Sequence, residues 1–257
     1  MNILAIGDIC GKSGCEELLK KLPKIKKDYK IDLTVVNGEN SAEGNGILPS
    51  SAESIFAAGA DVITGGNHTL RRKEIYNILE ENSRVLRPAN YPDSVPGSGI
   101  AYVDLGYTIA AVINIMGVIY LENLACPFET ADKMILQAQK NGAKQIFIDF
   151  HAEATSEKRT LGFYLDGKIT AMFGTHTHVQ TADAQILTNG SGYITDLGMT
   201  GVIDSVLGIK KEIIIKRMKD KLPEKFCNAQ GEAQVCGCIF TTDNKTGKTI
   251  AVKRIVV

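Results

Sequence analysis

The first quarter of the chain alternates short apolar runs with longer amphipathic segments, and this alternation restricts the fold more than any other feature. Residues 2–6, 33–36 and 61–64 are apolar runs of strand length. Between them, residues 13–29 and 50–58 carry apolar side chains at helical spacing. Strand, helix, strand, helix, strand is the order of parallel βαβ units. We therefore predict an α/β fold with a parallel sheet.

The rest of the chain continues this pattern and then ends in a different way. Residues 100–104 and 108–114 predict a hairpin that follows the Pro- and Gly-rich segment 87–99. Further elements are predicted as helices at 129–140, 153–164 and 211–219, as strands at 145–150 and 169–173, and as a hairpin of 233–242 with 249–257. Pro23 is expected to bend or divide the first helix. No repeat or linker marks a boundary, so we expect a single domain over residues 1–257.

Composition excludes several classes of function. Lys plus Arg and Asp plus Glu each number 29, so the formal net charge is zero and no bulk nucleic-acid binding is expected. The chain has no run of about 18 apolar residues, and its N-terminus lacks the basic start of a signal peptide. We expect a cytoplasmic protein without a membrane span. A homo-oligomer is left open, with segment 87–99 and the C-terminal hairpin as candidate interfaces.

The six cysteines are expected to be free thiols, because a cytoplasmic chain of this size seldom relies on disulfides. Cys236 and Cys238 stand two residues apart and would share one face of a strand. They could form a metal site together with Cys227, or serve as small core residues of the hairpin. We favour the core, because no histidine lies near them in the sequence.

Polar residues able to bind metals follow five of the predicted strands. They include every histidine of the chain and are Asp8, Glu39 with Asn40, Asn67 with His68, His151, and His176 with His178. The carboxyl ends of parallel strands meet at one edge of a sheet, where α/β proteins build their sites. A core histidine is the ordinary explanation for one such position. Four of four, with Asp, Glu and Asn beside them, indicate a metal site.

The ligand types favour two transition-metal ions. Three or four imidazoles do not suit an all-oxygen calcium or magnesium cage, but they suit Mn, Fe, Co or Zn. Asp8 and Glu39 against two divalent ions leave a net charge of about +2, or about +1 with a bridging hydroxide. Such a positive site attracts a phosphate ester. The expected substrate is therefore a small phosphoester.

The segments around these residues resemble one known family. NGENSAEGNG, GGNHT, FIDFHAEATSEK, GTHTHVQTADAQIL and GYITDLGMTG are similar, over nearly the full chain, to the YmdB-like 2',3'-cyclic-nucleotide 2'-phosphodiesterases. That family is a branch of the calcineurin-like metallophosphoesterase superfamily. Cys10 stands where the superfamily's DxH motif has histidine, and Glu39-Asn40 replaces its usual bridging aspartate motif. Both departures are typical of the branch. The resemblance implies a four-layer α/β/β/α sandwich.

The resemblance also implies roles for the site residues. One ion would be held by Asp8, Asn40 and His178, the other by Asn67, His151 and His176, and Glu39 would bridge both. His176 and His178 could serve different ions, because alternate residues of an extended segment project the same way. The expected ions are Fe or Mn, with Zn or Co as alternatives. His68 would donate a proton to the leaving 2'-oxygen, or else bind metal or orient the substrate.

The implied reaction is attack by a metal-bridging hydroxide on a 2',3'-cyclic nucleotide, which yields the 3'-nucleotide. The same site could instead serve a phosphomonoesterase, a 3',5'-cyclic phosphodiesterase, a nuclease or a metal-dependent nucleotide sensor. Leu70, Arg71 and Arg72 follow GNHT where the family commonly has Trp-Asp. An arginine there could bind an anion or simply begin a solvated helix. Cys10 is expected to be a packing residue beside the site, or else a thiolate ligand.

Overall fold

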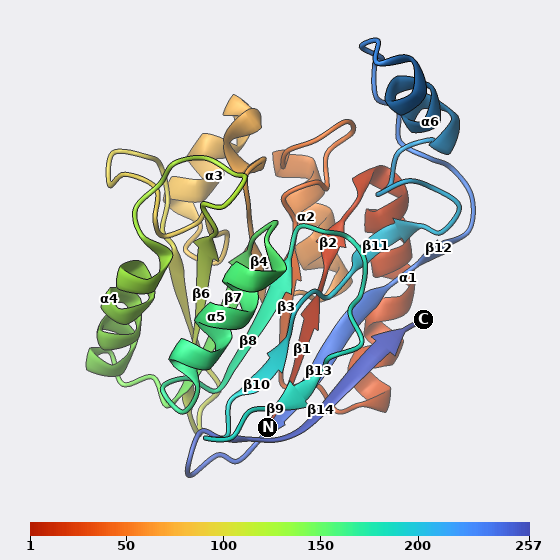
Figure 1. Ribbon diagram of the computed structural model, residues 1–257. Coiled ribbons are helices and arrows are strands. Elements are labelled where there is room, and N and C mark those ends of the chain that lie inside the picture. Colours follow the sequence, from red (N-terminus) through yellow and green to blue (C-terminus); the bar gives the residue numbers. More distant parts are fainter.

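Two β-sheets stacked face to face form the centre of the molecule in a computed structural model that describes residues 1–257 (Figure 1). The first sheet has the order β14-β13-β1-β3-β4. Its strands are β1 (Asn2–Ile6), β3 (Leu33–Asn37), β4 (Val62–Thr64), β13 (Cys236–Thr242) and β14 (Thr249–Val256). β1, β3 and β4 run parallel, as the sequence predicts. β13 and β14 continue the sheet beyond β1 as an antiparallel hairpin.

The second sheet has the order β5-β6-β7-β8-β10-β9. Its strands are β5 (Ile100–Asp104), β6 (Ile109–Met116), β7 (Gln145–His151), β8 (Ala171–Thr175), β9 (Gln185–Ile186) and β10 (Gly192–Ile194). The four central strands run parallel, and β5 and β9 are antiparallel edges. A small third sheet joins β12 (Ala233–Gln234), β11 (Met199–Val202) and β2 (Asp8–Ile9).

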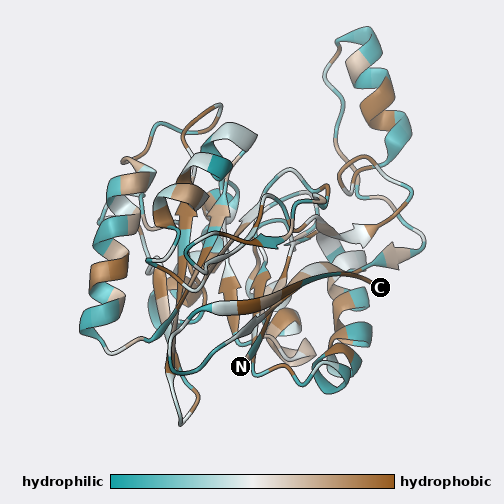
Figure 2. Cartoon of the chain, turned by 60° about the horizontal axis from the view of Figure 1, so that its bottom comes forward, coloured by the Kyte–Doolittle hydropathy of each residue, from teal (hydrophilic) through white to brown (hydrophobic).

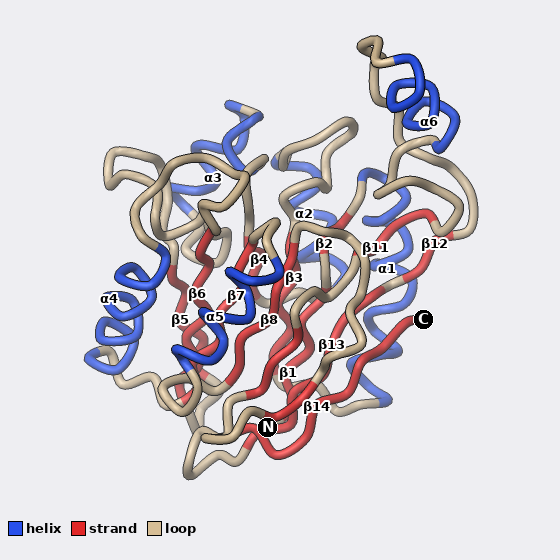
Figure 3. The backbone as a smooth tube through the Cα atoms, in the orientation of Figure 1, coloured by secondary structure: helices blue, strands red, loops and turns tan.

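Helices cover the outer faces of the two large sheets (Figure 3). The chain forms α1 (Gly11–Asp28), α2 (Pro49–Ala58), α3 (Tyr76–Glu81), α4 (Pro127–Lys140), α5 (Thr155–Leu165) and α6 (Lys211–Asp220), with 3-10 turns η1 (Thr69–Arg71) and η2 (Lys73–Ile75). One apolar cluster joins α1 and α2 to the first sheet, and another joins α4 and α5 to the second. A third cluster lies between the sheets. These three clusters fill the three interfaces between the layers of an α/β/β/α sandwich, as predicted.

The alternation of side chains along β1 shows how the sequence builds two of these interfaces. Ile3 and Ala5 belong to the cluster between the sheets, whereas Leu4 and Ile6 belong to the cluster under α1 and α2. Successive residues of a strand point to opposite faces, so a strand covered on both sides is apolar throughout. In Figure 2 the central strands are accordingly brown, while the helices alternate brown and teal.

Most predicted elements are confirmed to within a few residues, and three points differ. Pro23 does not divide α1, because it is exposed while Leu22 and Ile25 beside it are buried against the sheet. The predicted strand 233–242 is two strands, β12 and β13. The short strands β2, β9, β10 and β11 and the helix α3 were not predicted, since two to six residues are too few to show a period.

Helix α6 stands away from the sandwich (Figures 1 and 2). Of its ten residues only Ile214 is buried. None of the helices combines the length and the apolar character that crossing a bilayer requires.

Candidate metal centre

The polar residues that follow the parallel strands meet at one end of the sandwich. Glu39 and Asn40 follow β3, and Asn67 and His68 follow β4. His151 ends β7, His176 and His178 follow β8, and Asp8 begins β2 directly after β1. Strands of both sheets therefore contribute to one site. The glycine before Asn67 makes this approach sterically feasible, since a Cβ on Gly66 would clash with His151 Nε2 and a Glu39 carboxylate oxygen.

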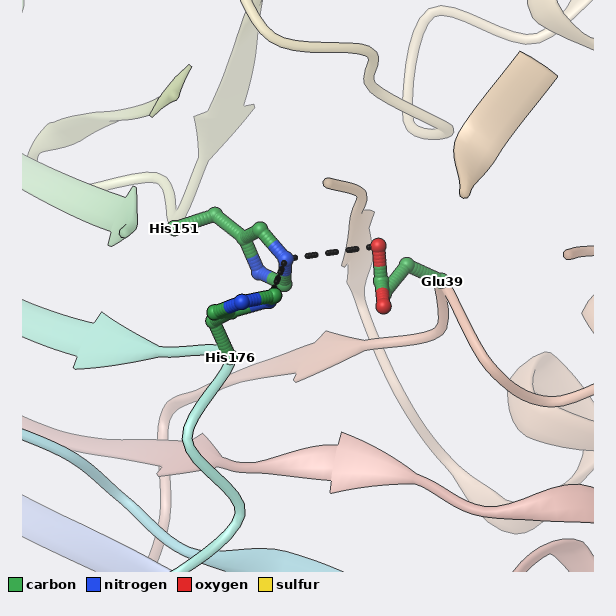
Figure 4. Close-up of side chains that lie close together, drawn as sticks. All are labelled: Glu39, His151 and His176. Atoms are coloured by element: carbon green, nitrogen blue, oxygen red, sulfur yellow. Dashed lines mark hydrogen bonds and ion pairs between the residues drawn. The ribbon is translucent and has the colours of Figure 1, made fainter. Parts of the chain in front are cut away.

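Glu39, His151 and His176 form the centre of this site (Figure 4). Their candidate ligand atoms all lie within 4.8 Å of one another. His151 Nε2 lies 3.3 Å from Glu39 Oε2 and 3.1 Å from His176 Nδ1. Glu39 and His151 are fully buried, and His176 is partly buried. A carboxylate and two imidazoles that converge in this way can hold a divalent transition-metal ion.

Hydrogen bonds behind His151 determine which of its nitrogens faces the centre. The Thr175 hydroxyl donates to Asp149 Oδ1 at 2.7 Å, so its oxygen is free to accept from His151 Nδ1 at 2.9 Å. Nδ1 of the neutral ring can therefore hold the proton, which leaves the lone pair of Nε2 for a cation beside Glu39 and His176. Burial lowers the pKa of His151 to about 3, so the ring is neutral at pH 7.

The surroundings of the Asp8 carboxylate fit a bound cation. Its carboxylate is fully buried, and Oδ1 has no hydrogen-bond partner. Burial, together with the nearby charges of Asp196 and Glu39, raises the pKa of Asp8 well above its usual value. A buried carboxylate oxygen without a donor is costly, and an adjacent cation removes that cost. The residues present therefore fit a bound metal ion.

The other predicted ligands lie around this centre in two groups. Asp8 Oδ1 is 3.7 Å from His178 Nε2, and Asn40 Nδ2 is 3.5 Å from the same nitrogen. On the other side, Asn67 Oδ1 is 2.9 Å from His151 Nε2. Glu39 lies between the groups, with Oε1 accepting from Asn40 Nδ2 at 2.6 Å and Oε2 beside His151. Each of the seven predicted ligands thus lies beside at least one other.

His68 lies beside the centre and lines the cavity above it. Its backbone N–H donates to Glu39 Oε2, and its Nδ1 is 2.9 Å from Glu39 Oε1. Burial works to lower the pKa of His68, but the hydrogen bond and charge of Glu39 outweigh burial and raise it above its usual value. The ring is partly exposed, with 26% of its side chain accessible, so a ligand in the cavity can reach it.

Comparison with known proteins identifies the family of this fold and site. A family model described as YmdB-like protein matches residues 4–255. The chain belongs to the YmdB-like family. The family resemblance of the sequence motifs is thereby confirmed.

Relatives match this chain over its whole length. A Bacillus subtilis (strain 168) protein named 2',3'-cyclic-nucleotide 2'-phosphodiesterase is 46% identical over 257 residues, which cover 100% of this chain and 97% of that protein. A hypothetical protein from Thermus thermophilus has a solved structure with TM-score 0.94 and 36% identity, covering 100% of this chain and 99% of that one. A novel phosphatase from Mycoplasma pneumoniae gives TM-score 0.93 and 32% identity, covering 100% and 93%.

The loop that carries His176 and His178 is not extended, contrary to the sequence expectation. Both residues have positive φ values, 101° for His176 and 63° for His178. Residues with a side chain seldom adopt this conformation, and surrounding contacts must hold it in place. Asp8 accepts a hydrogen bond from the His176 backbone N–H, and Asp196 accepts two from Thr177. The two rings therefore reach opposite sides of the centre through a turn.

Lys158 and Asp196 support this loop, although no motif or spacing singles them out. Both are fully buried, and Lys158 Nζ donates to Asp196 Oδ2 at 2.7 Å and to the Thr175 carbonyl at 2.8 Å. The ion pair fixes the position of the Asp196 carboxylate that accepts the two hydrogen bonds from Thr177. Both residues stand inside segments that resemble the family, but nothing in their spacing indicates that they pair.

Glu153 is a further residue of the site that was not predicted. Its Oε2 lies 3.1 Å from His176 Nε2. His176 therefore presents Nδ1 to the centre and Nε2 to a carboxylate, which is the usual arrangement behind a metal-binding histidine. Its position two residues after His151 in FHAE is the signal that could have pointed to it.

The surroundings of Cys10 bear on the alternatives of a packing residue and a thiolate ligand. Cys10 is buried, with Sγ 3.6 Å from His178 Nδ1, and the backbones of Gly201 and Gly208 pack on its Cβ. These contacts are those of a small packing residue beside the site.

Arg72 and the three C-terminal cysteines each have a structural environment. Arg72 donates to the carbonyls of Glu43 and Asn45 and so supports the glycine-rich loop. Cys236 and Cys238 are buried in β13, where the core interpretation places them, and Cys227 is exposed.

Proposed function

We propose that this protein is a dinuclear-metal phosphodiesterase that hydrolyses 2',3'-cyclic nucleotides to 3'-nucleotides. The observation that carries the proposal is the buried, partnerless oxygen of Asp8 next to the converging Glu39, His151 and His176. Relationship to a protein named for this activity, at 46% identity over the full chain, supports the choice of reaction.

The two groups of side chains suggest how two ions would be shared. Asp8, Asn40 and His178 would hold one ion, Asn67, His151 and His176 the other, and Glu39 would contact both. Bound ions of this kind polarise phosphoryl oxygens and supply a nucleophile at neutral pH. The donors are three imidazoles, two carboxylates and two amides, which favour Fe or Mn, with Zn or Co as alternatives.

His68 would supply the proton that the leaving 2'-oxygen needs. Glu39 fixes the ring through Nδ1 and leaves the other edge near the cavity, 3.3 Å from the Asn67 amide. A positioned acid of this kind contributes about 10²–10⁴-fold to the rate. His68 contacts the centre through Glu39 and Asn67, and we assign it to the proton rather than to an ion.

A broader activity on phosphomonoesters or 3',5'-cyclic nucleotides is the second candidate. A related solved structure is described as a phosphatase, and the cavity above the centre is large, about 570 Å³. A metal-dependent nucleotide sensor would use the same contacts without turnover. We place the protein in the cytoplasm and treat the chain as one domain.

Hydrolysis of 2',3'-cyclic AMP separates these functions. The protein is stripped of metal, reconstituted with Mn²⁺ or Fe²⁺, and assayed with 2',3'-cyclic AMP, 3',5'-cyclic AMP and 5'-AMP, with product isomers resolved by chromatography. We expect 3'-AMP from the first substrate, and loss of activity on chelation. Preference for 5'-AMP would favour the phosphatase, and no turnover by protein that has bound two ions would favour the sensor.

A further inference from the structure

The cavity above the metal centre has an apolar wall that phosphate chemistry does not require. It is lined at one end by His68, His176 and His178 and at the other by Ile214, Met218 and Phe226. The volume of about 570 Å³ lies in the usual range of small-molecule sites, about 300–1,000 Å³. The apolar end comes from α6 and the segment after it, which stand away from the sandwich.

We call residues 203–228, which include α6, the α6 arm. The base of this arm contacts residues of the metal centre. The Leu207 carbonyl lies 3.3 Å from His178 Nδ1, and Gly208 packs against Cys10. The Ala229 N–H donates to the Gly208 carbonyl at 2.8 Å. A wall built on the residues that position His178 is held in a defined place relative to the phosphate-binding end.

The wall has the composition of a stacking surface. Met218 is 66% exposed and Phe226 is 40% exposed, although both line the cavity. The Arg217 guanidinium lies over the Phe226 ring, 4.7 Å from its centroid. Proteins stack nucleobases on aromatic side chains and on arginine planes, and every base offers such a face.

Asn228, beside this wall, has a side-chain oxygen without a hydrogen-bond partner. This oxygen, Oδ1, is buried, and Asn228 lines the same cavity. An unpaired acceptor of this kind is costly unless a ligand donates to it. A ribose hydroxyl or a base N–H is such a donor.

We propose that Ile214, Arg217, Met218 and Phe226 form a nucleobase subsite for a nucleotide whose phosphate lies at the metal centre, with Asn228 accepting a hydrogen bond from its base or sugar. The proposal rests on the proposed function for the position of the phosphate. Stacking without a set of base-specific donors holds purines and pyrimidines alike, so the subsite selects nucleotides over other phosphodiesters rather than one base over another.

The test compares substrates with and without a base. The variants Phe226→Ala and Met218→Ala are assayed with 2',3'-cyclic AMP and with the 2',3'-cyclic phosphate of methyl riboside. Ile215→Ala is the matched control, because Ile215 lies on the same helix, is 59% exposed and does not line the cavity. Calorimetric titration of the metal-loaded proteins with 3'-AMP and with inorganic phosphate gives a readout independent of turnover.

For 2',3'-cyclic AMP we expect KM to rise about tenfold to a hundredfold in Phe226→Ala, and less in Met218→Ala, with kcat nearly unchanged. The riboside substrate and the Ile215→Ala control should be unaffected, and 3'-AMP but not phosphate should bind more weakly. Equal losses on both substrates, or unchanged KM, would overturn the subsite. A change in oligomeric state with unchanged KM would do the same and assign the wall to a second copy of the chain. If wild-type protein hydrolysed neither substrate, the proposed function would fail, while the 3'-AMP and phosphate titrations would still decide the subsite.

Discussion

The proposed metal centre and the α6 arm lie at two ends of one cavity and are built in opposite ways. Asp8, Glu39 and His151 are fully buried and are positioned by strands of both sheets. The arm exposes most of its apolar side chains and has one buried residue in its helix. Charged ligands need a fixed, dry setting, because a small displacement weakens every interaction with the phosphoryl group. Recognition of a base tolerates a looser surface, because stacking depends little on exact geometry.

The largest effect is expected from removing the charge of the Asp8 carboxylate. Asp8→Asn should lower turnover more than about a thousandfold, because several kcal/mol of metal-supplied stabilisation is lost. The same change should raise the urea midpoint of the metal-free protein, since burial and two nearby carboxylates already oppose the charge of Asp8. Elemental analysis should show less bound metal. Full metal content with normal turnover would contradict the role of Asp8.

His68→Ala separates proton donation from metal binding. Turnover should fall by about 10²–10⁴-fold, as is usual for loss of a general acid, while metal content stays the same. The leaving group supplies a further check, because a cyclic substrate with a more acidic leaving oxygen should lose less. Loss of metal from His68→Ala would instead make this residue a ligand.

Lys158→Met tests whether the loop below His176 and His178 depends on the buried ion pair. The change removes the only cation paired with the buried Asp196 side chain, so the free energy of unfolding measured in urea should fall by about 3–5 kcal/mol. Lys168→Met serves as the control, because Lys168 makes an exposed ion pair with Asp132 and should cost less than about 1 kcal/mol. Equal effects of the two changes would show that the buried pair does not support the loop.

Glu153→Gln should have a smaller effect on the same centre. Loss of the carboxylate behind His176 should weaken metal affinity by about 10–100-fold, with folding stability nearly unchanged because Glu153 is half exposed. A competitive chelator titration measures the affinity. An affinity equal to that of the wild type would mean that Glu153 does not orient His176.

Leu222→Ser should have the smallest effect. Leu222 is 60% exposed on the arm and does not line the cavity, so unfolding should change by less than about 0.5 kcal/mol. Urea denaturation measures it. A large loss of stability would show that the arm is packed more firmly than its exposure indicates.

The sequence predicted which polar residues follow the strands and meet at one end of the sheets. It did not predict the residues that hold these side chains in place. Apolar runs followed by Asp8, Glu39, Asn67 and His151 place ligands at strand ends, because parallel strands align their carboxyl ends. The pairing of Lys158 with Asp196 joins residues 38 apart, with no local pattern to show it.

The position of the α6 arm and the backbone conformation of the THTH segment could not be predicted from the sequence either. The helix at 211–219 was predicted, but its distance from the sandwich depends on tertiary contacts at Leu207 and Gly208. The left-handed backbone at His176 and His178 depends on hydrogen bonds to Asp8 and Asp196, and histidine itself gives no local sign of it.

Anomalous X-ray scattering from crystals loaded with Mn²⁺ tests the central claim most directly. We predict two peaks about 3.5–4 Å apart, as in other two-metal sites. One peak should adjoin Asp8, Asn40 and His178, the other Asn67, His151 and His176, with Glu39 between them. A single peak, or peaks away from Glu39, would contradict the dinuclear centre.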